Sequence, residues 1–249
     1  MAKTILITGA SSGLGEEMSR QFADLGYDLG LCARRTGRLD ALRAELIAAH
    51  PDQRFEVRAL DVNNDDQVLE VFKSFAADFG QVDRVIINAG IGKGAPIGSG
   101  RYDANKQTAM TNFVAALAQA EATMEIFREQ AAGHLVVISS ISALRGMPKA
   151  GATYAATKAG VAHLAEGLRA ELLHTPIKVS VIYPGYIRSE MNAAVKHAPF
   201  IASTEKGVRA IVDAIEKEKP RAYVPAWPWV PVGVALRFLP LRLAKRLMS

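Results

Sequence analysis

The sequence predicts an α/β fold, a doubly wound parallel sheet of about seven strands in a single domain. Short apolar runs alternate with longer segments of helical period almost to the end of the chain. The short runs are nearly continuously hydrophobic, as at Val136, Val137 and Ile138, which is typical of strands buried on both faces. Strands that alternate with helices of this length imply right-handed crossovers, which place helices on both faces of the sheet.

The expected elements follow one another in a regular order. Strands are predicted at residues 4–8, 28–33, 55–60, 84–88, 134–139 and 178–183, with a weaker one at 222–225. Helices are predicted at 16–25, 37–49, 67–79, 105–130, 153–173 and 204–217, and irregular chain at 92–100, 186–203 and the proline-rich 227–231. We therefore expect one domain over residues 1–224, with residues 225–249 as an extension of it.

Composition excludes several classes of protein. The chain has 249 residues, of which 49% are hydrophobic, enough for a large core. Its single cysteine excludes a disulfide framework, and its five scattered histidines show no ligand spacing, so we expect no metal site. We see no signal peptide and no apolar run long enough to cross a bilayer, and we therefore expect a cytoplasmic protein.

The basic charge is concentrated at the end of the chain. The net charge is +5, but residues 225–249 contain no acidic residue. The basic residues there are Arg237, Arg242, Lys245 and Arg246. The rest of the chain is nearly neutral, so a general nucleic-acid-binding surface is not expected.

A glycine-rich loop joins the first strand to the first helix. Glycine is needed where the backbone approaches a pyrophosphate, and a helix N-terminus offers free N–H groups to phosphates. The spacing T-G-x3-G-x-G resembles that of the short-chain dehydrogenase/reductase family, which implies a Rossmann-type dinucleotide-binding catalytic domain over residues 1–224. The expected cofactor-binding residues of this loop are Gly9, Ser11, Ser12, Gly13, Leu14 and Gly15.

The end of the second strand predicts which nicotinamide cofactor is bound. A carboxylate there would bind a ribose 2′-hydroxyl, whereas arginine suits a 2′-phosphate. The sequence has Arg34 and Arg35 and no acid at this place, which favours NADP(H). The family resemblance adds further cofactor contacts after the third, fourth and sixth strands. These are Asp61, Val62, Asn88, Ala89, Gly90, Pro184, Gly185, Ile187 and Ser189.

Tyr154 and Lys158 form the centre of the expected catalytic group. Four residues apart, they share one face of a helix, and a neighbouring ammonium group lowers the pKa of a phenol. Tyr154 can then act as general acid toward a carbonyl or as base toward an alcohol. The resemblance implies that Lys158 binds the nicotinamide ribose and that Asn112 holds a proton relay. The alternative for Asn112 is a purely structural amide.

The substrate-orienting serine is less directly marked. In the family it usually lies 13 positions before the tyrosine, where this sequence has Ile141. When the alignment with the family is instead set from the strand expected at 134–139, the family's pair of serines falls on Ser139 and Ser140. We assign Ser140, with Ser142 as the reserve candidate.

The resemblance implies an NADP(H)-dependent oxidoreductase that interconverts a ketone or aldehyde and an alcohol. The segment 186–203 contains Met191, Val195, Pro199, Phe200 and Ile201, which favours an apolar or lipid-like substrate. A 3-oxoacyl-thioester reductase with an acidic carrier docked on the basic tail is one alternative. A non-catalytic NADP-sensing or scaffold protein is another. The family commonly forms homodimers or homotetramers through helices equivalent to 105–130 and 153–173.

The extension has its own pattern. Leu236, Leu239, Leu243 and Leu247 recur at helical spacing, and Trp227 and Trp229 precede them among prolines. A basic amphipathic helix with nearby tryptophan is typical of a peripheral membrane contact. A helix that packs over the substrate pocket or on a partner subunit is the other interpretation.

Overall fold

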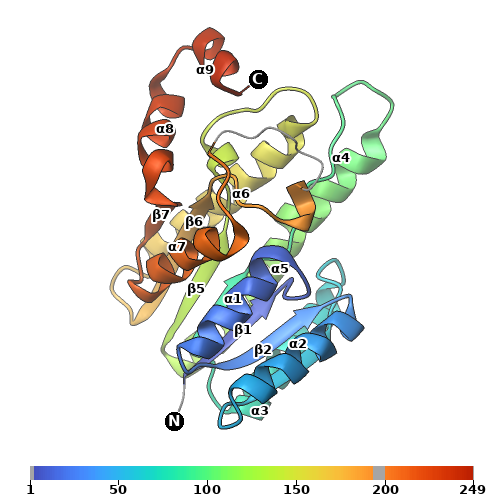
Figure 1. Cartoon of the computed structure of the whole chain (residues 1–249), viewed down its shortest axis with the longest axis vertical. Helices are drawn as coiled ribbons and strands as arrows, with labels where there is room; N and C mark the ends of the chain where they lie inside the picture. The colour runs from blue at the N-terminus through green and yellow to red at the C-terminus, as the bar shows by residue number, and fades with distance from the viewer. Residues whose placement is uncertain (1–2, 193–199, 249) are drawn as a thin grey trace.

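Parallel strands form the centre of the molecule in the order β3-β2-β1-β4-β5-β6-β7 (Figure 1). This computed structural model describes residues 3–192 and 200–248. The strands are β1 (Thr4–Thr8), β2 (Asp28–Ala33), β3 (Phe55–Ala59), β4 (Arg84–Ile87), β5 (Gly133–Ile138), β6 (Ile177–Pro184) and β7 (Arg221–Val224). The predicted seven-stranded α/β fold is confirmed. Chain order reverses between β1 and β4, and in such sheets ligands bind at the carboxyl end of that switch point.

Helices cover both faces of the sheet. One face carries α1 (Gly13–Asp24), α2 (Thr36–Ala49) and α7 (Thr204–Glu216). The other carries α3 (Asp65–Phe79), α5 (Ala115–Gln130) and α6 (Gly151–Glu171), and α4 (Tyr102–Ala109) leads into α5 and packs on α6. None of the helices among the described residues is long and apolar enough to cross a membrane.

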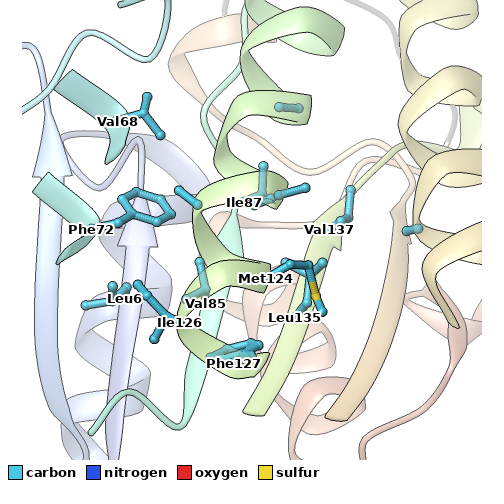
Figure 2. Close-up of a cluster of buried hydrophobic side chains, with 14 of the residues drawn as sticks. Leu6, Val68, Phe72, Val85, Ile87, Met124, Ile126, Phe127, Leu135 and Val137 are labelled. Atoms are coloured by element: carbon cyan, nitrogen blue, oxygen red, sulfur yellow. The ribbon is translucent and has the colours of Figure 1, made fainter. Parts of the chain in front are cut away.

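The core explains why the strands read as continuous apolar runs. Successive β1 side chains alternate between the two faces: Leu6 packs on the α3 and α5 side, and Ile5 and Ile7 on the other. Figure 2 shows the first of these layers, where Phe72 and Phe127 meet β-strand side chains. Burying one such phenylalanine stabilises the fold by about 2–3 kcal/mol.

Two of the predicted elements are wrong. The helix expected over 105–130 is interrupted by a π-helical turn, Met110–Val114, between α4 and α5. The segment 227–231, expected to be irregular, lies in α8 (Ala226–Phe238), where only Trp227 keeps a non-helical backbone and kinks the helix. Its prolines are tolerated because they fall in or beside the first turn, where N–H groups lack a helical acceptor.

The C-terminal helical pattern is also not continuous. Leu239 is extended and Pro240 follows it, so α9 (Leu241–Met248) starts as a separate helix. The described side chains end at Ala244, and the expected positions of Lys245, Arg246 and Leu247 on a helical face lie outside them.

A buried polar network lies at the opposite edge of the sheet from the glycine loop. Arg84 donates from Nε to His134 Nδ1 at 3.0 Å and from Nη1 to Glu216 at 2.6 Å. His134 Nε2 is 2.8 Å from Ser180 Oγ. Burial, and then the Arg84 charge, lower the pKa of His134 to about 3, so its imidazole is neutral at physiological pH.

Candidate active site

The glycine loop closes tightly on the strands around it. Gly9 and Gly13 have φ values of +68° and +59°, which favour glycine. A Cβ on Gly15 would lie 2.4 Å from the carbonyl oxygen of Gly9, so only glycine lets α1 approach β1 this closely. The Ser12 side chain does not cap α1 but accepts a hydrogen bond from Arg35. The N–H groups of the first turn of α1, including that of Leu14, are therefore left for another acceptor.

Arg35 and Arg38 form a cationic site beside this loop. Arg35 donates to Ser11 Oγ at 3.3 Å and also to Ser12 Oγ. The Glu190 carboxylate receives 3.0 Å and 2.6 Å bonds from Arg35 and Arg38, which hold its pKa at about 2. Arg34 is exposed, and no hydrogen bond to its side chain is found within the described part of the chain. Arg35 and Arg38 thus already bind an anionic group, the carboxylate of Glu190.

The residues expected after the third and fourth strands lie at the same edge. Asp61 accepts from Asn63 at 3.0 Å, and Val62 is buried. Asn88 donates from Nδ2 to the Thr8 carbonyl at 2.9 Å. The backbone N–H groups of Asn88 and Ala89 both donate to Thr8 Oγ1 at 3.1 Å. These bonds fix the end of β4 to the end of β1, next to the glycine loop.

Ser140 and Tyr154 are brought together by β5 and α6. Ser140 precedes a short 3-10 helix, Ile141–Leu144, and its side chain lies near enough to the Tyr154 phenol to lower the pKa of that group. Ser142 reaches only Ser140, with its hydroxyl donating to Ser140 Oγ at 3.0 Å. The geometry therefore favours Ser140 over Ser142. Ser139 is buried, and its hydroxyl donates to the Lys158 carbonyl at 2.7 Å, which ties the end of β5 to α6.

The expected lowering of the Tyr154 pKa is wrong. Burial raises the pKa of Tyr154, and the nearby Ser140 side chain only partly opposes it. Lys158 lies with Nζ 6.0 Å from the centre of the Tyr154 ring and donates instead to the Ile138 carbonyl at 2.9 Å. Burial lowers the pKa of Lys158 to about 8. The ammonium group is itself desolvated, so it is poorly placed to stabilise a phenolate.

Asn112 is the last member of a polar stripe that holds the segment after β4. Its Oδ1 accepts from the Ile91 N–H at 2.8 Å and its Nδ2 donates to the Ile91 carbonyl at 2.9 Å. Asn105 makes the same pair of bonds to the backbone of Ala95, both at 3.1 Å. Thr108, between them, donates to the carbonyl of Lys93. We call Asn105, Thr108 and Asn112 the polar stripe.

Asn112 and Lys158 converge over Gly90. A Cβ on Gly90 would lie 3.2 Å from Asn112 Oδ1 and 3.5 Å from Lys158 Nζ. Both side chains thus face the same side of the chain where β4 ends. π-helical turns are frequent at functional sites, and the one that contains Asn112 re-aims it toward Lys158.

The turn after β6 completes the edge. Pro184 ends the strand, and a Cβ on Gly185 would lie 2.0 Å from the Trp229 indole. Asn192 holds the turn by donating to the Ile187 carbonyl at 2.7 Å and accepting from the Ser189 N–H at 2.8 Å. Met191 contacts Gly92, so the two irregular segments meet. Val195 and Pro199 lie outside the described residues.

These residues fit a dinucleotide. A separate open cleft of about 420 Å³ runs along the outer side of α1 and is lined by Gly13, Glu16, Glu17, Arg20, Arg188, Ser189, Glu190 and Thr204. A helix N-terminus, glycines at close approach and an arginine pair already bound to a carboxylate are the donors that a pyrophosphate and a further phosphate need. No group of acidic, histidine or cysteine side chains suited to a metal occurs among the described residues.

Sequence reasoning missed three contributors: Arg38, Glu190 and Asn192. Arg38 and Glu190 are exposed charged residues 152 positions apart, and nothing local indicates that they pair. The polar stripe did leave a signal, because three polar residues at intervals of three and four share one face of a helix.

Known proteins with similar sequences point in one direction. A sequence profile described as short chain dehydrogenase matches residues 3–199. An uncharacterized oxidoreductase of Mycobacterium tuberculosis is 52% identical over 242 residues, covering 97% of this chain and 96% of that protein. An uncharacterized oxidoreductase of Myxococcus xanthus is 34% identical over 229 residues, covering 91% and 88%.

Solved structures with a similar fold are also short-chain dehydrogenases. A short-chain dehydrogenase from Sphingobium yanoikuyae in complex with NADPH is similar with a TM-score of 0.82 and 27% identity, over 98% of this chain and 94% of that one. A short chain dehydrogenase/reductase from Burkholderia phymatum in complex with NAD has a TM-score of 0.84 at 22% identity, over 98% and 95%. The second likeness shows the fold alone.

Proposed function

The chain belongs to the short-chain dehydrogenase family and is an oxidoreductase of that family; we propose that it uses NADP(H) to interconvert a ketone or aldehyde and an alcohol on an apolar or lipid-like substrate. The observation that carries the proposal is the convergence of Ser140, Tyr154, Lys158 and Asn112 beside the glycine loop.

The preference for NADP(H) is supported by Arg35. Its guanidinium already lies across Ser11 and Ser12, and together with Arg38 it binds a carboxylate. The same donors suit a 2′-phosphate, and no acid stands at the end of β2 to receive a 2′-hydroxyl. Arg34, being exposed beside it, adds positive charge. The bound cofactor supplies or accepts the hydride.

The chain's own residues handle the proton and the carbonyl oxygen. Tyr154 transfers the proton through its hydroxyl. Ser140, whose side chain lies near the Tyr154 phenol, donates to the carbonyl oxygen as charge develops there. Lys158 holds the nicotinamide ribose, and Asn112 fixes the backbone at Ile91 and faces Lys158. A positive charge on Lys158 close to the Tyr154 hydroxyl would lower the pKa of that phenol.

The preference for an apolar substrate rests on the side chains around this edge. Ile97, Met191 and Phe200 are large apolar residues exposed on the two irregular segments. Phe200 and Tyr186 pack edge-on to Trp229, which closes the same side. A substrate with extended apolar surface would bury these groups.

We also propose a cytoplasmic homo-oligomer. Met110, Phe113, Val114 and Leu117 are large apolar side chains partly exposed along the π-helical turn and α5. Such a row is suited to burial against a second copy, and it lies on the helices through which the family associates.

The test is a fluorescence titration of the purified protein with NADPH and with NADH, followed by a panel of apolar ketones and aldehydes, with Tyr154→Phe as control. We expect tighter binding of NADPH and oxidation of NADPH that is lost in Tyr154→Phe. A preference for NADH would refute the assignment of Arg35. Binding of NADPH without turnover across a panel that includes a 3-oxoacyl thioester would favour the sensor alternative.

A further inference from the structure

The outward face of α8 is an apolar stripe open to solvent. Val230, Val234 and Phe238 follow one another at intervals of four residues along one side of the helix, and Trp227, whose backbone is not helical, precedes them. Trp227 and Phe238 at its two ends are 80% and 82% exposed. Leu241, the first residue of α9, is also exposed. We call these five residues the α8 stripe.

The inward face of the same helix is fixed to the candidate active site. Trp229 and Leu236 are buried with Ile141, next to Ser140, and Trp229 also packs on Tyr186. At the other end of α8, Arg145 donates to the carbonyls of Arg237 and Leu239, which anchors the C-terminus of the helix. The α8 stripe is therefore presented by a helix held at both ends.

The position of the helix matters as well. In Figure 1, α8 and α9 stand at the end of the molecule toward which the strands point, and α8 contacts β7 and the 3-10 helix Ile141–Leu144. This is the edge where the substrate-facing segments lie, whereas the α2 and α3 helices are at the far end.

The charge around the α8 stripe selects its partner. Arg237 and Arg242 are exposed beside Phe238 and Leu241, and residues 225–249 carry four basic and no acidic residues. A symmetric contact with a second copy would bring this cationic segment against itself. An anionic bilayer offers apolar depth for the stripe and negative headgroups for the arginines.

We propose that the α8 stripe docks the protein on an anionic lipid surface, so that the candidate active site opens toward the bilayer. Tryptophan and phenylalanine enter the interface between headgroups and acyl chains, and Arg237 and Arg242 contact lipid phosphates. The docking does not depend on the proposed oxidoreductase activity, but it would give that site access to lipid-like substrates.

The experiment measures vesicle binding of the full chain without cofactor or substrate. Large vesicles of phosphatidylcholine, alone or with one quarter phosphatidylglycerol, are sedimented with the protein and the bound fraction is measured. We expect binding to the anionic vesicles only, reduced at least about tenfold in Phe238→Ser. We expect about a fivefold reduction in Arg237→Gln. The control is Leu173→Ser, which removes an exposed leucine just before β6, at the amino-terminal end of the strands. This variant should bind vesicles like the wild type.

Tryptophan emission gives a second readout. The chain has two tryptophans, of which Trp227 is exposed and Trp229 buried. Anionic vesicles should shift the emission to shorter wavelength in the wild type and not in Trp227→Phe. Absence of sedimentation and of the shift would overturn the proposal. So would a Phe238→Ser variant that binds vesicles normally but has half the wild-type mass in light scattering, which would assign the stripe to a second copy.

Discussion

Removing the Asn112 side chain should cost both stability and turnover, and its neighbour in the polar stripe allows the two losses to be separated. In Asn112→Ala the two hydrogen bonds to Ile91 disappear, and the N–H and carbonyl of that partly buried residue lose their partner. At about 1 kcal/mol for each bond and up to 1 kcal/mol more for an unsatisfied group, the unfolding free energy should fall by about 2–3 kcal/mol.

Asn105→Ala is the matched control. Asn105 is 8% exposed and Asn112 1%, both are on the same side of the helix, and each binds the N–H and the carbonyl of a single residue in the segment after β4. The stability loss should therefore be similar. Only Asn112 faces Lys158 across Gly90, so only Asn112→Ala should also lower kcat strongly, by more than about tenfold.

The assay is thermal unfolding of both variants, together with steady-state kinetics on whichever carbonyl compound the substrate panel identifies. For a chain of this size the expected stability loss lowers Tm by roughly 4–12 °C. Equal losses of kcat in the two variants would show that Asn112 acts only by holding Ile91. An unchanged Tm in both would refute the hydrogen-bond reasoning itself.

Three further outcomes are expected. Glu190→Gln frees Arg35 and Arg38 from their carboxylate, so the Kd for NADPH, measured by fluorescence titration, should fall about two- to fivefold with that for NADH unchanged; weaker NADPH binding would contradict this. His134 is neutral when folded and takes up a proton on unfolding, so the free energy of unfolding in urea should drop between pH 7 and pH 5 by about 2 kcal/mol more in the wild type than in His134→Gln. Parallel pH profiles would remove His134 as the cause. Ser140→Ala should lose at least about a hundredfold in kcat and Ser142→Ala less than about tenfold, and the reverse order in the same kinetic assay would move the substrate contact to Ser142.

The strands, and the placement of Tyr154 and Lys158 on one helix, could be predicted because their signals are local. β1 and β5 are apolar runs buried on both faces, and Tyr154 and Lys158 share one helical turn. The interruption of the helix at Met110–Val114 could not be predicted in the same way. It depends on bonds from the polar stripe to an extended segment, and the helical pattern of the sequence runs through it without a break.

The pairing of Arg38 with Glu190 and the state of Tyr154 were beyond the sequence for another reason. Both depend on which charges meet across the fold. Local spacing placed Lys158 beside the phenol, but in the folded chain its ammonium group donates to the carbonyl of Ile138 in β5. Sequence spacing identifies such residues, and the three-dimensional surroundings decide their protonation.

The close approach of Trp229 to Gly185 ties the last 25 residues into the cooperative folding of the rest. A Cβ at Gly185 would occupy the position of the indole, so this glycine is required by packing from α8 in addition to any demand of the cofactor. Cutting the chain after Val224 would remove Trp229 and so expose Ile141, which follows Ser140, and Tyr186 to solvent. The compositional border at residue 225 is therefore not a border between folding units, and a shortened chain should unfold as a damaged whole rather than persist as an intact core.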